Sequence, residues 1–160
     1  MSPDELGRRV WDLRMPLLRL ACTILRNSQE AEDAVSDAVI RAFERLDTLR
    51  DEAALRPWLM RITVRCCYEH ARRLRRERPC EDPEPLCPPV QPQQESALTD
   101  LIARLPSGQR EALLLYYYEG FSVEELACIL GVPRPAASMR LSRGRRRLRE
   151  LIETEGRDEG

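Results

Sequence analysis

Apolar and small side chains recur every three or four positions along most of this 160-residue chain. This is the spacing of one face of an α-helix. No stretch alternates between apolar and polar residues for long enough to indicate a strand of a sheet. The pattern therefore predicts an all-α protein.

Three amphipathic helices are predicted in the first half of the chain. The first carries an apolar stripe at Val10, Leu13, Leu17, Leu20 and Ile24. Pro16 lies within this helix and is expected to kink or split it, because proline lacks an N–H and clashes with the preceding turn. The second helix follows a cap at 27–30 and carries Ala31, Val35, Ala38, Ala42 and Leu46. The third has Pro57 in its first turn, ends in the arginines of 72–78, and carries Leu55, Leu59, Ile62 and Cys66.

A proline-rich segment, PCEDPEPLCPPVQPQQE, follows at residues 79–95 and holds six of the twelve prolines and no arginine. Such a composition is typical of an extended, poorly packed linker. The sequence thus predicts two small helical domains, at 1–78 and 96–160, joined by this acidic linker.

The second domain contains the pattern of a helix-turn-helix at 121–149. Ser122 and Glu125 form a predicted capping box at the start of its first helix, whose inner face is expected to be Val123, Leu126, Ala127 and Leu130. Gly131 follows where the chain must turn. Pro133 and Pro135 are tolerated in the first turn of the next helix, because the N–H groups there have no partner within the helix.

The second helix of this motif carries a predicted buried stripe at Ala137, Leu141, Gly144, Leu148 and Ile152. Helical periodicity then directs four other side chains outward, namely Met139, Ser142, Arg143 and Arg146. These residues are candidates for contact with the major groove of DNA. Two alternatives remain at this point, a merely solvated basic face and a protein-docking module.

The formal net charge is only −1, but positive charge is concentrated in parts of the chain. All 26 basic residues are arginines, and they concentrate at 72–78 and 140–149. Residues 79–100 carry five acids and no arginine. The chain is therefore no general nucleic-acid coat, but it has two basic segments.

The sequence offers little for other kinds of site. It has no apolar run long enough for a membrane span and no signal-like start, which predicts a cytoplasmic protein with reduced cysteines. Cys22 and Cys128 lie on apolar stripes and are expected in the core. Cys66 and His70 could share a helix face as metal ligands, but a lone histidine without a CxxC pair makes this weak. No catalytic motif is present, so neither an enzyme nor a cofactor is expected.

Cys80 and Cys87 lie in the predicted linker and leave open a role as a reporter of redox state.

Several segments, in order along the chain, resemble the extracytoplasmic-function group of bacterial sigma-70 factors. They are Glu30–Phe43, Arg56–Ile62, Leu105–Pro106, Gln109–Leu115, Tyr118–Ala127 and Leu141–Arg149. The resemblance implies a first domain that binds the β′ clamp of RNA polymerase and melts the minus-ten element. It implies a second domain that reads the minus-thirty-five element and meets the β flap, and a linker that threads the RNA exit channel.

The resemblance also assigns roles to individual residues. Asp33, Asp37 and Arg41 would face polymerase, and the loop 46–54 would take the unpaired strand. Contact with DNA is implied for Arg65, Arg72, Arg73, Arg76, Ser138, Met139, Arg140, Ser142, Arg143 and Arg146. An anti-sigma factor is an expected partner, and membrane insertion is not expected.

The chain departs from the family pattern at several of these positions. Relatives usually carry Gln and Phe where this chain has Ser36 and Val39, aromatic residues at Leu49 and Leu55, and Asn at Arg65. The segment 135–139 also lacks the usual lysine of the recognition helix. An alternative function is therefore a sigma-like DNA-binding regulator or adaptor without promoter-melting activity.

Overall fold

The protein is described here by a computed structural model that covers residues 1–77 and 97–159, with side chains over 1–77 and 100–156. The chain divides into two compact units, Met1–Val90 and Gln91–Gly160, and each is described by itself. Within the described residues all regular elements are helical, which confirms the all-α prediction. The predicted linker at 79–95 lies outside the described residues.

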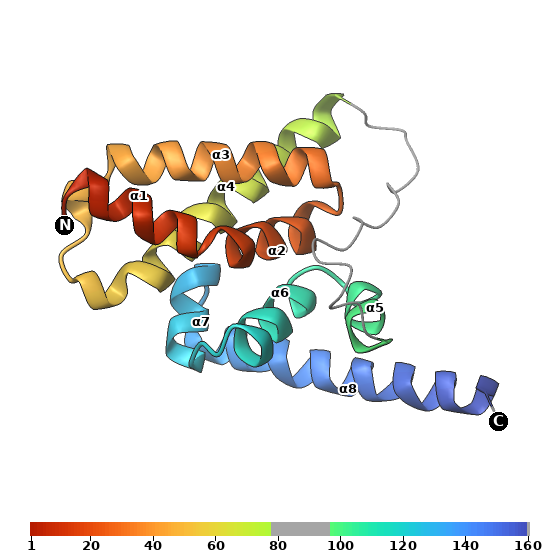
Figure 1. Ribbon diagram of the computed structural model, residues 1–160. Coiled ribbons are helices and arrows are strands. Elements are labelled where there is room, and N and C mark those ends of the chain that lie inside the picture. Colours follow the sequence, from red (N-terminus) through yellow and green to blue (C-terminus); the bar gives the residue numbers. More distant parts are fainter. Residues whose placement is uncertain (78–96, 160) are drawn as a thin grey trace. The chain divides into compact units, whose positions relative to one another are not determined.

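The first unit consists of four α-helices, α1 (Pro3–Asp12), α2 (Arg14–Leu25), α3 (Ser28–Glu44) and α4 (Leu55–Glu77) (Figure 1). Two short 3₁₀ turns, η1 (Leu46–Thr48) and η2 (Glu52–Ala54), join α3 to α4. Helices α2, α3 and α4 pack against one another in pairs, and α1 lies against α2 and α3. The core of this unit therefore lies between α2, α3 and α4.

The expected break near Pro16 is confirmed and falls at Leu13, which ends α1 and precedes α2. In a continuous helix the nitrogen of Pro16 would face the carbonyl of Asp12, but proline has no N–H to donate and its ring crowds that carbonyl. Regular bonding resumes where the N–H of Leu17 donates to the carbonyl of Leu13 over 3.0 Å. Proline thus becomes a residue of the first turn of α2, where it is tolerated.

Helix α3 approaches its neighbours through small residues. Ala31, Ala34, Ala38 and Ala42 are completely buried. Across from them α4 buries Leu55, Leu59, Ile62 and Cys66, as the sequence predicted. The side chain of Asn27 caps α3 by accepting the N–H of Glu30 over 2.9 Å. Small residues on one helix and large ones on the next allow close packing without voids.

The second unit contains α5 (Ala97–Ala103), α6 (Gln109–Leu113), α7 (Val123–Leu130) and the long α8 (Arg134–Glu159) (Figure 1). Between α6 and α7 the chain makes one π-helical turn, η4 (Leu114–Tyr118). Helix α8 packs against α5, α6 and α7. The α7–α8 pair forms the helix-turn-helix that the sequence predicts.

The local signals of this motif are confirmed in detail. The hydroxyl of Ser122 accepts the N–H of Glu125 over 3.1 Å, while the carboxylate of Glu125 accepts the N–H of Ser122 over 3.0 Å. Gly131 ends α7 in the left-handed conformation, at φ 69°. A residue with a Cβ would be strained there, and glycine is not.

Replacing Ser122 with alanine is expected to destabilise the second unit by about 1 kcal/mol, because the N–H of Glu125 loses its acceptor at the helix start. For a unit of this size, that loss lowers the midpoint of thermal unfolding by about 4–8 °C. Circular dichroism of the full chain measures the change. Ser36→Ala on the exposed side of α3 is the control, and an equal effect in both variants would contradict the capping role.

Two sequence predictions about the core are wrong. The sequence predicts Ile152 on the buried stripe of α8, but its side chain is 48 % exposed, whereas Leu151 beside it is half-buried. Cys128 was placed in the core but is exposed on α7. Its neighbours Ala127 and Ile129 are buried, so the buried face of this short helix includes the positions on both sides of Cys128 but not Cys128 itself.

None of the described helices is both long and apolar enough to cross a membrane.

Candidate nucleic-acid interface

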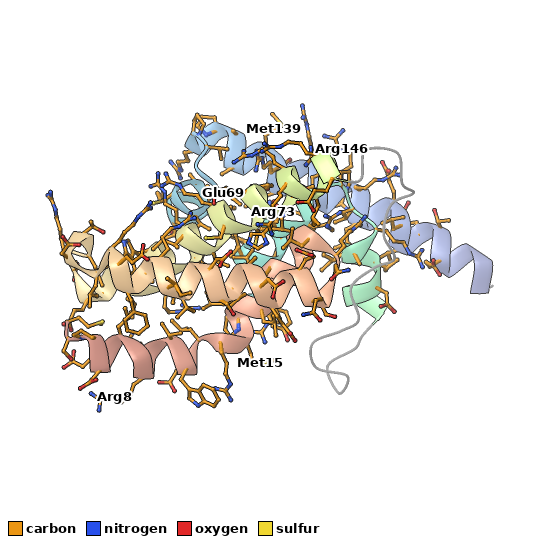
Figure 2. The ribbon with its side chains drawn as sticks, turned by 90° about the horizontal axis from the view of Figure 1, so that it is seen from above. Arg8, Met15, Glu69, Arg73, Met139 and Arg146 are labelled. Carbon is orange, nitrogen blue, oxygen red and sulfur yellow. The ribbon has the colours of Figure 1, made fainter. Side chains whose placement is uncertain are left out.

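The outer face of α8 carries the side chains that periodicity directed outward. Met139 is 48 % exposed, and Ser138, Ser142, Arg143 and Arg146 are exposed as well. Figure 2 shows Met139 and Arg146 on the same side of α8, two turns apart. The face therefore presents two guanidinium groups, two hydroxyls and one thioether along a single helix surface, a set that can contact both bases and phosphates.

The flanks of this face are held by contacts within the unit. Arg140 is only half-exposed, and its side chain lies over Gly108, so that a Cβ built there would be 3.6 Å from the Arg140 guanidinium carbon. On the opposite flank Arg145 lies over two rings, at 5.5 Å from the centroid of Tyr116 and 5.3 Å from that of Tyr117. Its Nε also donates a hydrogen bond to the hydroxyl of Tyr117.

These contacts distinguish Arg140 and Arg145 from Arg143 and Arg146. Periodicity did not place Arg140 on the outer face, and the family resemblance implied a DNA contact for it; neither gave a role to Arg145. The only signal for the second contact was the run of three tyrosines at 116–118. Tyrosine rings attract arginine because the ring face is electron-rich.

The direction of the outer face is fixed on the opposite side of α8 by Gly144. A Cβ at this position would be 3.2 Å from Cγ and 3.3 Å from Cδ1 of Leu113 on α6. The two helices thus approach through a residue without a side chain. A Cβ here requires the Leu113 side chain to shift by a few tenths of an ångström, and a large side chain requires a larger rearrangement of the contact between α6 and α8.

A buried polar cluster supports the loop before α6. Arg110 is 5 % exposed and Glu111 is completely buried. The Nη1 of Arg110 donates to the carbonyl of Leu105 over 2.6 Å, and the hydroxyl of Ser107 donates to Glu111 over 2.9 Å. Arg110 and Glu111 belong to a segment on which the family resemblance rests. Their side chains form hydrogen bonds within the unit.

The first unit carries a second basic surface along α4. Arg65, Arg72, Arg73 and Arg76 are exposed. They come from a helix whose other side is buried against α2 and α3. Arg65 lies near the middle of α4 and the other three lie in its last turns, so arginines follow the exposed part of the helix, an arrangement suited to a phosphate backbone.

Two of the three candidate polymerase-binding residues of α3 form hydrogen bonds with side chains of α4. Asp33 is exposed, but Asp37 accepts a hydrogen bond from Nε2 of His70 over 2.6 Å. Arg41 donates from Nη1 and Nη2 to the two carboxylate oxygens of Glu69, over 3.2 and 2.9 Å. Asp37 and Arg41 thus connect α3 to α4, and a partner that contacts them must share them with that connection.

The hydrogen bonds from Arg41 hold the pKa of Glu69 below its ordinary value, although partial burial acts in the opposite direction. A carboxyl group with a lowered pKa in the folded state stabilises the fold above its unfolded pKa and loses that contribution as the pH falls.

We therefore expect Glu69→Gln to be slightly less stable than the native protein at neutral pH. The effect should be small because the pair is partly exposed. The difference should shrink as the pH falls below about 4.3, where glutamate ordinarily takes up its proton. Urea unfolding at several pH values measures this, with Glu32→Gln on the exposed side of α3 as control. A constant difference at all pH values would contradict it.

The weak metal alternative at Cys66 and His70 gains no support. Burial raises the pKa of the Cys66 thiol, which disfavours the thiolate that binds metals. Both ring nitrogens of His70 lie against other side chains. Over the described ranges, no three His, Cys, Asp or Glu residues gather closely enough to hold a metal ion. Cys80 and Cys87 lie outside those ranges.

Comparison with known proteins covers both units. Residues 12–77 match the family profile described as Sigma-70 region 2, and residues 95–148 match Sigma-70, region 4. The ECF RNA polymerase sigma factor SigM of Mycobacterium tuberculosis is 34% identical, over 93% of this chain and 76% of the relative. A probable RNA polymerase sigma factor of Xanthomonas campestris, RfaY, is 32% identical over 92% of this chain, which spans only 40% of that relative's length.

A solved structure is also similar. The sigma factor RpoE of Bartonella quintana, determined in complex with the anti-sigma factor NepR, matches with a TM-score of 0.79. It is 26% identical, and the match covers 93% of this chain and 97% of the other.

Proposed function

The chain belongs to the extracytoplasmic-function group of sigma-70 factors, and from this we infer that it binds core RNA polymerase and directs it to specific promoters. The observation that carries the inference is the presence of both sigma regions, in order, in a chain whose α8 presents an exposed polar and basic face. As a transcription initiation factor it has no bond-making step of its own, because polymerase supplies the chemistry. It would act in the cytoplasm, where the bacterial chromosome lies.

We propose a division of labour between the two units. The first, with 1–78 as its domain, would bind the β′ clamp through the exposed side of α3, where Asp33, Asp37 and Arg41 lie. Contact with the DNA strands near the minus-ten element would come from Arg65, Arg72, Arg73 and Arg76 of α4. The exposed guanidinium groups of α4 support this, since phosphate contacts supply much of the affinity for DNA.

The second unit, with 96–160 as its domain, would read the minus-thirty-five element in the major groove. The residues that would contact bases or phosphates are Ser138, Met139, Ser142, Arg143 and Arg146, and Arg140 would reach a phosphate from the flank. Paired guanidinium donors favour guanine, whose O6 and N7 both accept hydrogen bonds. The linker at 79–95 would connect the two contacts through the RNA exit channel.

We also propose that an anti-sigma factor regulates the chain. The support is the similarity to RpoE of Bartonella quintana, which was determined with the anti-sigma factor NepR bound.

The function is tested by combining the purified chain with core RNA polymerase and mapping transcript starts on genomic DNA fragments. Specific starts with shared upstream elements are expected. Failure to bind core polymerase even at low salt would contradict the proposal. Core polymerase alone is the control, since it should start without sequence preference.

One observation favours the alternative of a regulator without melting activity. Residues 46–54 contain no aromatic side chain, and Leu55, at a position where relatives carry an aromatic, is completely buried. Stacking of an unpaired base on a ring contributes about 1–3 kcal/mol. A duplex site protected by the chain in the absence of polymerase, together with no transcript starts, would support this alternative.

A further inference from the structure

The only histidine of the chain is buried where α4 lies against α3. His70 is 5 % exposed, although its helix ends in a run of solvated arginines. No contact proposed above for polymerase or DNA uses this ring. Each ring nitrogen of a histidine can nevertheless donate or accept a hydrogen bond, depending on which of them carries a proton.

Both ring nitrogens have specific neighbours. Nε2 lies 2.6 Å from Oδ2 of Asp37, and Nδ1 lies 3.2 Å from Nη2 of Arg73. The donor and acceptor roles of the two nitrogens depend on the tautomer. A guanidinium group can only donate hydrogen bonds, so the contact with Arg73 fits an unprotonated Nδ1. The contacts thus fit a neutral ring with its proton on Nε2, donated to Asp37.

A third group, the carboxylate of Glu30, lies beside Nδ1. Oε2 of Glu30 lies 3.7 Å from that nitrogen, and it is buried without a hydrogen-bond partner. Leaving a buried carboxylate oxygen unsatisfied is costly. A proton on Nδ1 would allow this oxygen to accept a hydrogen bond, but Arg73 occupies the nitrogen in its place.

The two ends of this chain of contacts reach solvent. The side chain of Asp37 is 52 % exposed, and Arg73 is exposed. Figure 2 shows Arg73 and Glu69 one turn apart on α4. In the proposed function Asp37 lies on the surface for polymerase and Arg73 on the surface for phosphate. His70 therefore connects the two surfaces.

We propose that His70 is a positioning residue that links capture of a DNA phosphate by Arg73 to the uptake of one proton. In the free protein, Nδ1 of His70 holds the Arg73 guanidinium. When Arg73 turns to a phosphate, Nδ1 loses its donor, takes up a proton from solvent and, keeping that proton, donates a hydrogen bond to Oε2 of Glu30. The imidazolium then lies between Glu30 and Asp37. This inference rests on the proposed function, because it requires a phosphate-bearing strand at the end of α4.

The surrounding charges are compatible with this exchange. From α3 the ring faces Glu30 and Asp37, and on its own helix it faces Arg73. Glu69, which precedes His70 on α4, accepts two hydrogen bonds from Arg41. Helix α2 also packs on α4 but contributes only arginines as charged residues, Arg14, Arg19 and the terminal Arg26, so it adds no carboxylate to the ring's surroundings.

The sign of the linkage follows from the proton count. Because the complex binds one proton more than the free chain, DNA affinity should rise as the pH falls. One linked proton gives at most about a tenfold change in affinity per pH unit.

The first test measures the tautomer in the free full chain. Because the chain has one histidine, nitrogen-15 spectra of the labelled imidazole report on His70 alone. At about pH 8 we expect a proton on Nε2 and none on Nδ1. Adding a mixed-sequence single-stranded oligonucleotide at low salt should move the Nδ1 signal toward the protonated position. A proton on Nδ1 in the free chain would overturn the proposal.

The second test measures oligonucleotide affinity against pH by fluorescence anisotropy. His70→Gln keeps an amide donor for Asp37 and a similar volume, so the chain should fold, but the rise of affinity at lower pH should disappear. Arg75→Gln is the matched control, because it removes one exposed charge from the same helix end. It should weaken binding at every pH and keep the pH dependence. An unchanged pH dependence in His70→Gln would overturn the proposal.

The tests separate this inference from the function on which it rests. The tautomer measurement needs neither polymerase nor promoter, so it can fail while specific transcript starts are found. Conversely, a chain with the expected tautomer and proton uptake that binds no core polymerase would contradict the proposed function alone.

Discussion

Replacing Gly144 with leucine is expected to destabilise the second unit severely and to remove recognition of the minus-thirty-five element with it. A Cβ at this position already lies 3.2 Å from Leu113, and leucine adds three further carbons to the contact between α6 and α8. Overpacking of this kind costs about 1–3 kcal/mol or more. A core this small supplies only about 3–5 kcal/mol of stability, so the loss is a large share of the total.

Thermal unfolding of the full chain measures this effect, and the midpoint for the second unit should fall by at least about 5 °C. Gly156→Leu is the matched control. It lies on the same helix, and a Cβ there meets nothing within 4 Å, so the gain in helix propensity should leave stability unchanged or slightly higher. If Gly144→Leu unfolded at the same midpoint as the native protein, the result would contradict the close approach of α6 and α8.

The double variant Arg143→Ala, Arg146→Ala is expected to lose promoter-specific transcription while the fold remains intact. Both side chains are exposed on the outer face of α8, so their removal leaves no cavity. A base or phosphate contact of this type contributes about 1–3 kcal/mol. Losing two should reduce initiation at the mapped promoters by at least about thirtyfold.

In vitro transcription with core polymerase measures the loss, and circular dichroism verifies the fold. Arg104→Ala is the control, since Arg104 belongs to the same unit but pairs with Glu155 across α5 and α8. It removes one positive charge away from the outer face and should retain transcription. Equal losses in both variants would mean that general charge, rather than the outer face of α8, supports initiation.

The sequence predicts those features of the fold that depend on local chemistry. The capping box at Ser122, the glycine turn at Gly131 and the break caused by Pro16 all depend on residues within a few positions of one another. The buried stripes of α3 and α4 follow from periodicity in long helices. The outward direction of Met139, Arg143 and Arg146 follows in the same way, because Ala137 and Leu141 fix the inner side of α8.

The remaining features depend on contacts between distant positions. His70 and Asp37 are 33 residues apart, and Arg145 and Tyr117 are 28 apart, so no local pattern could pair them. Ile152 follows the helical spacing of its stripe but is 48 % exposed, because spacing alone does not show which side chains of a long helix its neighbours cover. Contacts with DNA or polymerase depend also on the shape and charge of the partner. For the candidate residues, the sequence and the structure together therefore support proposed contacts.

The alanines of α3 have a consequence for how this protein can diverge. Because the distance from α3 to its neighbours is set by methyl groups at Ala31, Ala34, Ala38 and Ala42, the opposite side of the same helix bears none of the packing. Asp33, Ser36 and Ile40 are exposed there. Substitutions on that side can therefore change partner preference at little expense of stability, so orthogonal variants of this factor are best sought by randomising this surface while the alanines are kept.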